Sequence, residues 1–284
     1  MSKKNLATVL FKNSDLLKAH RVKFNNFASG LYEQSGASFA LQKPQGGITG
    51  GSKHLTVEFN GSQYKYKTNS IDPDHWFLTS NVGDDCVFVI IDKTSGVAEI
   101  HGIGNYKSCI IDTNQSVGST LLKITLKMLR KYKEKLGIKL IILTDNSVKR
   151  CHNVNIKLPN MMTLLTGDTW YGRYGFRPIT RSADSYTIDK TALSYYEKNK
   201  QIMSQVKITD IDLIKYISLT KNDKLIKAVG QLVKLDPNML IKDFLTNFIR
   251  DYDSTCEMFY KFYEKLYGKL GLFGFYRYLF GLYL

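Results

Sequence analysis

Three side chains that can take up a proton lie near one another in the sequence, within and just after predicted strands. Glu99 and His101 are two residues apart in the strand expected at 97–103, so alternation places them on one face of it. Asp112 ends a further short strand expected at 108–112. A carboxylate or a neutral imidazole in such a position removes a proton from a substrate, directly or through water. The alternative for each is a solvated side chain or one that caps a turn.

The residues that follow Asp112 are small and polar, and they lead into a predicted helix. The sequence Asp-Thr-Asn-Gln-Ser-Val-Gly-Ser-Thr occupies 112–120, and the helix is expected over 117–136. A helix N-terminus directly after a strand presents free backbone N–H groups and the positive end of the helix dipole, which together bind phosphate or pyrophosphate. A strand-to-helix turn capped by serine explains the same residues equally well.

Two hairpins and a strand–helix–strand unit are predicted to position these groups. Asn60-Gly61, between two alternating segments, is a strong signal for a two-residue hairpin loop. A second hairpin joins the apolar run at 86–92 to the strand at 97–103. After the helix, the apolar run at 138–143 is expected to pair in parallel with 108–112.

The two ends of the chain differ from this middle part. Residues 8–34 have helical spacing, and the Gly-rich segment 44–52 lacks the Gly-Lys-Ser/Thr order of a phosphate-binding P-loop. From about residue 200 the spacing is helical throughout and indicates a bundle. The aromatic tail 270–284 is too short and too charged to span a bilayer. We expect it to pack on the bundle or in a homodimer, with membrane-surface docking as the other interpretation.

The segment Trp170-Tyr-Gly-Arg-Tyr-Gly-Phe176 indicates an aromatic helix end closed by Gly175 and followed by a short strand. Together with the antiparallel strands, the helix entrance and the parallel strand before it, this segment resembles the GNAT superfamily of acyl-CoA-dependent N-acyltransferases over about residues 80–180. The resemblance implies an α+β fold: a mixed, mostly antiparallel sheet with a splayed parallel strand pair, flanked by helices. We therefore expect a GNAT-like domain at 1–199 and a helical C-terminal domain at 200–284, outside the usual family core.

The resemblance also implies where a CoA thioester would bind. The family's pyrophosphate loop has the pattern Gln/Arg-x-x-Gly-x-Gly/Ala, and two registers of that loop fit here, both of which use Gly118. The acyl group lies between the splayed strands, which correspond to 108–112 and 138–144, and an Asn frequently follows the second strand. The cofactor contacts implied are Ile110, Ile111, Gln115, Ser116, Val117, Gly118, Ser119, Thr120 and Asn146.

The activity implied is transfer of an acetyl or other acyl group from acyl-CoA to an amine of a small molecule or a protein. Such a reaction requires a base for the proton of the amine and an acid for the leaving thiolate. Tyr171, four residues before Gly175, is where similar enzymes often have a tyrosine acid, although it also suits aromatic packing. The candidate bases are Glu99, His101 and Asp112. The alternative is a GNAT-fold binding or structural protein with reduced catalysis, and the long segment between Asn146 and Tyr171 departs from the family pattern.

Charge indicates an anionic partner. The chain of 284 residues has 40 Lys and Arg against 25 Asp and Glu, a net charge of +15, and 32 of the cations are Lys. Residues 200–284 carry 13 cations and 9 anions, which leaves +11 for 1–199, the part with the expected CoA loop. A basic field around that loop favours capture of the CoA phosphates. The basic face of the helix, between Lys123 and Lys135, also suggests nucleic-acid binding, which we rank below CoA because Lys suits base recognition less well than Arg.

The cysteines and the composition give the expected compartment. Cys86, Cys109, Cys151 and Cys256 are far apart and show no metal-ligand spacing, so we expect free thiols, no metal site and an intracellular, cytoplasmic protein. The lean toward Lys, Asn, Ile and Tyr suggests an AT-rich genome, such as that of a large DNA virus or a parasite. If the chain is viral, a virion or viral factory is the alternative location.

Overall fold

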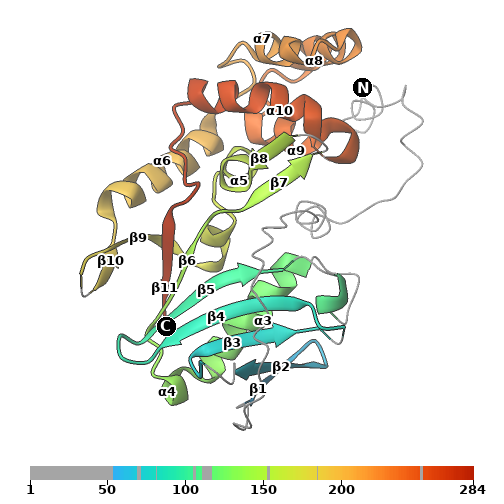
Figure 1. The fold of residues 1–284 in the computed structure, drawn as a ribbon. Helices are drawn as coiled ribbons and strands as arrows, with labels where there is room; N and C mark the ends of the chain where they lie inside the picture. The colour runs from blue at the N-terminus through green and yellow to red at the C-terminus, as the bar shows by residue number, and fades with distance from the viewer. Residues whose placement is uncertain are drawn as a thin grey trace. The chain divides into compact units, whose positions relative to one another are not determined.

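The computed structural model describes residues 54–68, 72–80, 82–104, 107–110, 117–151, 154–183, 185–249 and 252–284, except the side chains of 107 and 252–255 (Figure 1). The predictions for 8–34 and 44–52 lie outside these residues. The chain divides into two compact units, each built from segments distant in sequence. One unit includes the described residues up to Lys149 together with Tyr174–Asp189 and Arg277–Leu284. The other includes Arg150–Arg173 and Lys190–Tyr276, so the division does not fall at residue 200.

The first unit is built on a mixed sheet, in which the described strands follow the order β1-β2-β3-β4-β5-β6-β11-β9-β10. Every neighbouring pair is antiparallel except β5 and β6. The strands are β1 His54–Phe59, β2 Ser62–Thr68, β3 His75–Thr79, β4 Asp85–Asp92, β5 Val97–Ile103, β6 Leu140–Thr144, β9 Arg177–Arg181, β10 Tyr186–Ile188 and β11 Leu279–Tyr283. The prediction of an α+β fold with a mostly antiparallel mixed sheet is confirmed.

Both predicted hairpins are present, and local chemistry explains each turn. Asn60 and Gly61 have φ of 49° and 76°, the positive values that a two-residue hairpin loop of type I′ requires. In the β4–β5 turn, the carboxylate of Asp92 accepts hydrogen bonds from the backbone N–H and hydroxyl groups of Thr94 and Ser95. These bonds hold the pKa of Asp92 well below its usual value.

The helix expected at 117–136 is present as α3, Val117–Lys131, and a short α4, Lys133–Leu136. The apolar face of α3 is buried, and two tyrosines fix the helix to the first strands. The Tyr66 hydroxyl on β2 forms a buried 2.8 Å hydrogen bond with Thr125, and the Tyr132 hydroxyl donates to the backbone oxygen of Thr56 on β1 at 2.9 Å. The position of α3 on the sheet is therefore set near both its middle and its end.

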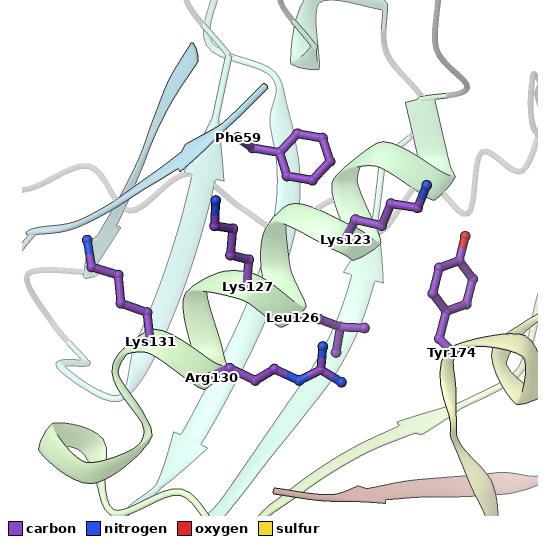
Figure 2. A pocket seen from close by; sticks show the side chains of 7 residues that line it. All are labelled: Phe59, Lys123, Leu126, Lys127, Arg130, Lys131 and Tyr174. Carbon is purple, nitrogen blue, oxygen red and sulfur yellow. The ribbon is translucent and has the colours of Figure 1, made fainter. Parts of the chain in front are cut away.

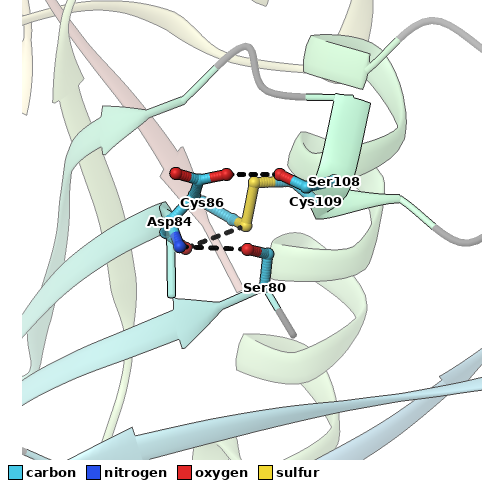
Figure 3. Close-up of a disulfide and its surroundings, with 5 residues drawn as sticks. All are labelled: Ser80, Asp84, Cys86, Ser108 and Cys109. Carbon is cyan, nitrogen blue, oxygen red and sulfur yellow. Dashed lines mark hydrogen bonds between the residues drawn. A yellow bond between two sulfur atoms is a disulfide. The ribbon is translucent and has the colours of Figure 1, made fainter. Parts of the chain in front are cut away.

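The prediction of a strand over 108–112 is wrong for its described residues, 108–110. Lys107–Cys109 form a single 3-10 turn, η2, and the parallel partner of β6 is β5. The sequence Ser-Cys-Ile-Ile has high β-propensity, but Cys109 is joined to Cys86 on β4 by a disulfide, and the segment makes a turn there (Figure 3). Ser108 Oγ also donates to the carboxylate of Asp84. The strand–helix–strand unit is therefore β5–α3–β6.

The periodicity predicts helical structure from about residue 200 onward, but the C-terminal tail ends in a strand. Its last strand, β11, lies between β6 and β9 in the sheet and pairs with both. Phe280 is fully buried, and a Cβ on Gly281 would lie 2.8 Å from Ile179 Cδ1, so the glycine allows close packing of β11 on β9. The end of the tail is thus part of the sheet of its own chain rather than of the helical bundle.

The second unit is mainly helical, as predicted for its residues from about 200. Its aromatic core includes ring contacts between Phe248 and Phe262, and between Phe259 and both Phe262 and Tyr263. Its helices are α5 Leu158–Thr166, α6 Lys190–Gln205, α7 Leu213–Ile217, α8 Asp223–Leu235, α9 Ile241–Phe248 and α10 Tyr252–Lys269. A separate two-stranded sheet consists of β7, Val148–Cys151, and β8, Val154–Lys157.

The prediction of free thiols is also wrong. Cys86 pairs with Cys109, and Cys151 pairs with Cys256, with Cα–Cα distances of 5.5 and 5.8 Å. The partners are 23 and 105 residues apart, so only the fold brings them together. Among the described residues, no helix has the length and apolar character needed to cross a bilayer.

Candidate functional site

The parallel strands β5 and β6 separate after a short paired stretch. Val97, Ala98 and Glu99 pair with Leu140, Ile141 and Ile142. Beyond that point β5 continues to Ile103 without pairing with β6, whereas β6 stays paired with β11. The side of β5 toward β6 thus has backbone groups at 100–103 that the described sheet does not use. We call the carboxyl ends of these two strands, Glu99–Ile103 and Leu143–Asn146, the strand mouth.

A β-bulge lies where the two strands separate. Phe88 of β4 is opposite Gly102, and Val89 is opposite Ile100, so His101 is the extra residue of β5. A bulge bends its strand and changes the direction of a side chain, and bulges are frequent next to active sites. The bulge therefore gives a local cause for the separation of β5 from β6.

The structure brings Glu99 and His101 together, as alternation predicted. His101 Nε2 lies 3.2 Å from Glu99 Oε2, and both side chains are more than a third exposed. The His101 ring centroid is 5.4 Å from that of Phe88, which also contacts the rings of Phe77 and His75. A carboxylate bonded to one imidazole nitrogen orients the ring and leaves its other nitrogen to accept a proton. The pair therefore has the geometry of a general base.

Asp145, directly after β6, is a titratable group that the sequence analysis did not select. The residue is fully buried, and its Oδ1 accepts hydrogen bonds from the Ser147 N–H, at 3.1 Å, and from the Ser147 hydroxyl. Its Oδ2 has no hydrogen-bond partner in the described structure. Burial raises the pKa of this carboxyl to about 7, although the Ser147 bonds oppose the shift. Its backbone is held by Arg277 N–H and Tyr278 C=O, next to β11.

The signal that could have found Asp145 is its place in the sequence. A carboxylate directly after a central strand with four buried residues is poorly solvated, and carboxylates with raised pKa values concentrate at functional sites. Asn146, the predicted cofactor contact beside it, is exposed, and its N–H donates to the Thr144 oxygen at 3.1 Å.

The predicted CoA contacts are described only in part. Val117, Gly118, Ser119 and Thr120 form the buried first turn of α3, which contains no acidic residue that would repel a phosphate. Ile110 is buried but follows the 3-10 turn rather than lying in a strand. Ile111, Asp112, Gln115 and Ser116 lie outside the described residues, and so does most of the connection between η2 and α3.

Tyr171 belongs to the helical unit and begins a 3-10 turn, η3, Tyr171–Tyr174. Its ring packs edge-on against the buried Trp170, with 4.6 Å between centroids. The turn depends on Gly172, where a Cβ would lie 1.9 Å from the Tyr196 hydroxyl oxygen and 2.1 Å from Asp168 Oδ1. Gly175, with φ of 93°, closes this turn and β9 follows it, as predicted, but the segment is a separate 3-10 turn rather than the end of an α-helix.

A second candidate site lies on the solvent side of α3, in the sheet unit (Figure 2). It is a groove of about 530 Å³ that combines four cations with two aromatic rings. We call it the α3 groove, and it is lined by Phe59, Lys123, Leu126, Lys127, Arg130, Lys131 and Tyr174. The basic face of this helix is evident in the sequence, whereas the two rings come from other elements and only the fold brings them to the groove.

Comparison of the chain with models of known protein families, with curated proteins and with solved structures found no match.

Proposed function

We propose that the protein is an N-acyltransferase of the GNAT type that transfers an acetyl group from acetyl-CoA to an amine of a small molecule or a protein. The observation that carries this proposal is the separation of the parallel strands β5 and β6, which are connected through α3. The sequence resemblance implies a parallel strand pair that separates, and the pairing of β5 with β6 supports this expectation, with β5 in the place that was predicted for 108–112. The acyl contacts move accordingly from Ile110 and Ile111 to the backbone at 100–103.

The chain has groups suited to holding a CoA thioester at this place. Beyond Glu99, β5 has unused backbone N–H groups that can donate hydrogen bonds and C=O groups that can accept them. An extended amide chain can pair with these groups in the way that an added strand does. The N-terminal end of α3, at Gly118, has the positive end of the helix dipole and no acidic residue in its first turn, so it would stabilise a pyrophosphate. Acetyl-CoA supplies the activated carbonyl, whose C–S bond breaks as the amine nitrogen forms the new C–N bond.

Proton transfer is assigned to the strand mouth. His101, oriented by Glu99, takes the proton from the attacking amine, and the leaving thiolate must gain one. Asp145, with a pKa of about 7, is a second group able to exchange a proton near neutral pH. Tyr171 remains the predicted acid for the leaving thiolate. The alternative function is a GNAT-fold binding protein with reduced catalysis, and the presence of the helical unit favours it.

Calorimetric titration with acetyl-CoA and with desulfo-CoA, followed by mass spectrometry of amine mixtures incubated with protein and acetyl-CoA, tests the proposal. We expect saturable binding of both compounds and at least one amine whose mass increases by one acetyl group. Binding without acetylation of any amine would favour the binding protein. Absence of any binding of acetyl-CoA at millimolar concentration would refute the acyltransferase.

A further inference from the structure

The cations of the α3 groove form a row on a rigid support. Lys123, Lys127 and Lys131 recur every four residues, which spans roughly 12 Å along a helix at 1.5 Å per residue, and Arg130 lies next to the row. The helix that carries them is fixed to β1 and β2 by the hydrogen bonds of Tyr132 and Tyr66. The spacing of the four residues along the helix is therefore determined before any ligand arrives.

These charges are not neutralised by the described part of the protein. All four side chains are exposed, α3 has no acidic residue, and no carboxylate among the described residues forms an ion pair with any of them. Lys131 donates to the Thr56 backbone oxygen at 3.0 Å, which directs its ammonium group toward the β1 side of the helix. Four clustered cations attract an anion with several charges rather than a single carboxylate.

Aromatic rings reach the same groove from two other elements. Phe59 is the last residue of β1, and Tyr174 ends the 3-10 turn before β9, so the rings flank α3 from different parts of the unit (Figure 2). Both rings are half-buried, and Leu126 adds an apolar surface between the charges. A row of cations with interspersed rings is the combination that holds single-stranded nucleic acid, in which phosphates meet the charges and bases stack on the rings.

We propose that the α3 groove binds single-stranded nucleic acid without sequence preference. The ring faces favour a single strand, because the bases of a duplex are already stacked. The lack of sequence preference follows from the side chains, since three of the four cations are Lys and only Arg130 has a fork able to read a base edge. The proposal does not depend on acyl transfer, because the groove contains none of the residues assigned to the strand mouth.

Fluorescence anisotropy with labelled 12-nucleotide oligothymidylate and oligouridylate tests the proposal, together with a duplex of equal length. We expect saturable binding of both single strands at 50 mM salt and weaker binding of the duplex. Single strands lose affinity with salt at about −0.7 logarithmic units per phosphate contact, so four contacts predict a slope near −2.8. The K123A/K127A variant is expected to reduce that slope by about 1.4.

The rings and matched lysines provide the controls. Phe59→Leu and Tyr174→Leu are each expected to weaken binding roughly tenfold with an unchanged salt slope, and Phe59→Trp to retain it even if leucine disturbs folding. K133A/K135A removes two cations from α4, outside the groove, and is expected to leave the slope as it was.

Four outcomes would overturn the proposal: no binding at 50 mM salt, equal effects of the two lysine pairs, duplex bound as tightly as single strands with no effect of the rings, or displacement of the oligonucleotide by equimolar AMP or CoA. The last would identify a mononucleotide site instead.

Discussion

The strand mouth and the α3 groove belong to the same unit, yet they contain opposite kinds of side chain. The mouth has a carboxylate–imidazole pair and a buried aspartate, whose backbone forms hydrogen bonds with Arg277 and Tyr278 just before β11. The groove has exposed cations and no carboxylate among its lining residues. One region is suited to moving protons, the other to attracting polyanions. The helix α3 belongs to both regions. It comes after β5 of the mouth in the sequence, and its later turns contain the cations of the groove.

The structure of the strand mouth should depend on β11, the strand paired with β6, far more than the structure of the α3 groove does. Deletion of 279–284 removes β11 from between β6 and β9, and we expect it to prevent stable folding of the sheet unit. The milder Phe280→Ala change, which empties a fully buried ring position, should cost about 3–5 kcal/mol of unfolding free energy. Urea denaturation measures the loss, and Tyr283→Ala, at a half-exposed position of the same strand, is the control. Equal stability of F280A and wild type would contradict the central position of β11.

Proton transfer separates the two regions functionally. His101→Asn removes the proposed base and should lower the acetylation rate about 10²- to 10⁴-fold with little change in acetyl-CoA affinity. Glu99→Gln should have a smaller effect in the same direction, because it alters only the orientation of the ring. Steady-state rates and calorimetry measure the two quantities. A K123A/K127A variant with the same loss of rate would place the chemistry in the groove instead.

The buried Asp145 predicts a pH dependence of stability. Its pKa is about 7 in the folded chain and near 3.9 when unfolded, so the folded state binds the proton more tightly. The unfolding free energy should be highest below about pH 4, decrease by up to about 1.4 kcal/mol per pH unit between pH 4 and 7, and level off above that. Asp145→Asn should remove this contribution and be relatively more stable at pH 8. Denaturation of both proteins from pH 4 to 8 gives the contribution of Asp145 as the difference between their unfolding free energies. If the two free energies changed with pH in parallel, Asp145 would be charged when buried.

The disulfide between Cys86 and Cys109 links β4 to the turn that precedes α3 (Figure 3). It closes a loop across a separation of 23 residues, for which chain entropy predicts about 3 kcal/mol of stabilisation. A C86S/C109S variant should be destabilised by about that amount under non-reducing conditions. Dithiothreitol should then destabilise it less than the wild type, since only the Cys151–Cys256 bridge is left to reduce. Thiol titration of the unfolded wild type checks the premise, and four free thiols would contradict it.

The smallest effect is expected at the groove. K123A/K127A changes two exposed side chains without ion pairs in the described structure, so the unfolding free energy should stay within about 0.5 kcal/mol of wild type. Thermal denaturation measures it. A larger change would show that these lysines have a structural role, which the groove proposal does not include.

Features with local causes could be predicted from the sequence. The Asn60-Gly61 hairpin, the turn after Asp92 and the start of α3 at Val117 all follow from neighbouring residues. So does the proximity of Glu99 and His101, because alternation within one strand determines it.

Features that depend on partners distant in the sequence could not be predicted from it. The pairing of β5 with β6 joins strands about 40 residues apart, and the apolar Ile110-Ile111 looked like a more direct neighbour for β6. The Gly-rich aromatic segment of β11 lacks an alternating pattern, because it lies between two strands and is largely covered. The α3 groove needs Phe59 and Tyr174, which are 115 residues apart.

The place of β11 between β6 and β9 also constrains how the protein can be made. During synthesis, β1 to β5 can pair with their neighbours as they emerge, but β9 has no described partner linking it to β6 until Leu279–Tyr283 has been translated. The helical segments between 190 and 276 are therefore completed while the sheet is still open. Long-range pairing of this kind slows folding and leaves strand edges exposed. Nascent chains should thus need chaperone protection until Leu279–Tyr283 has left the ribosome.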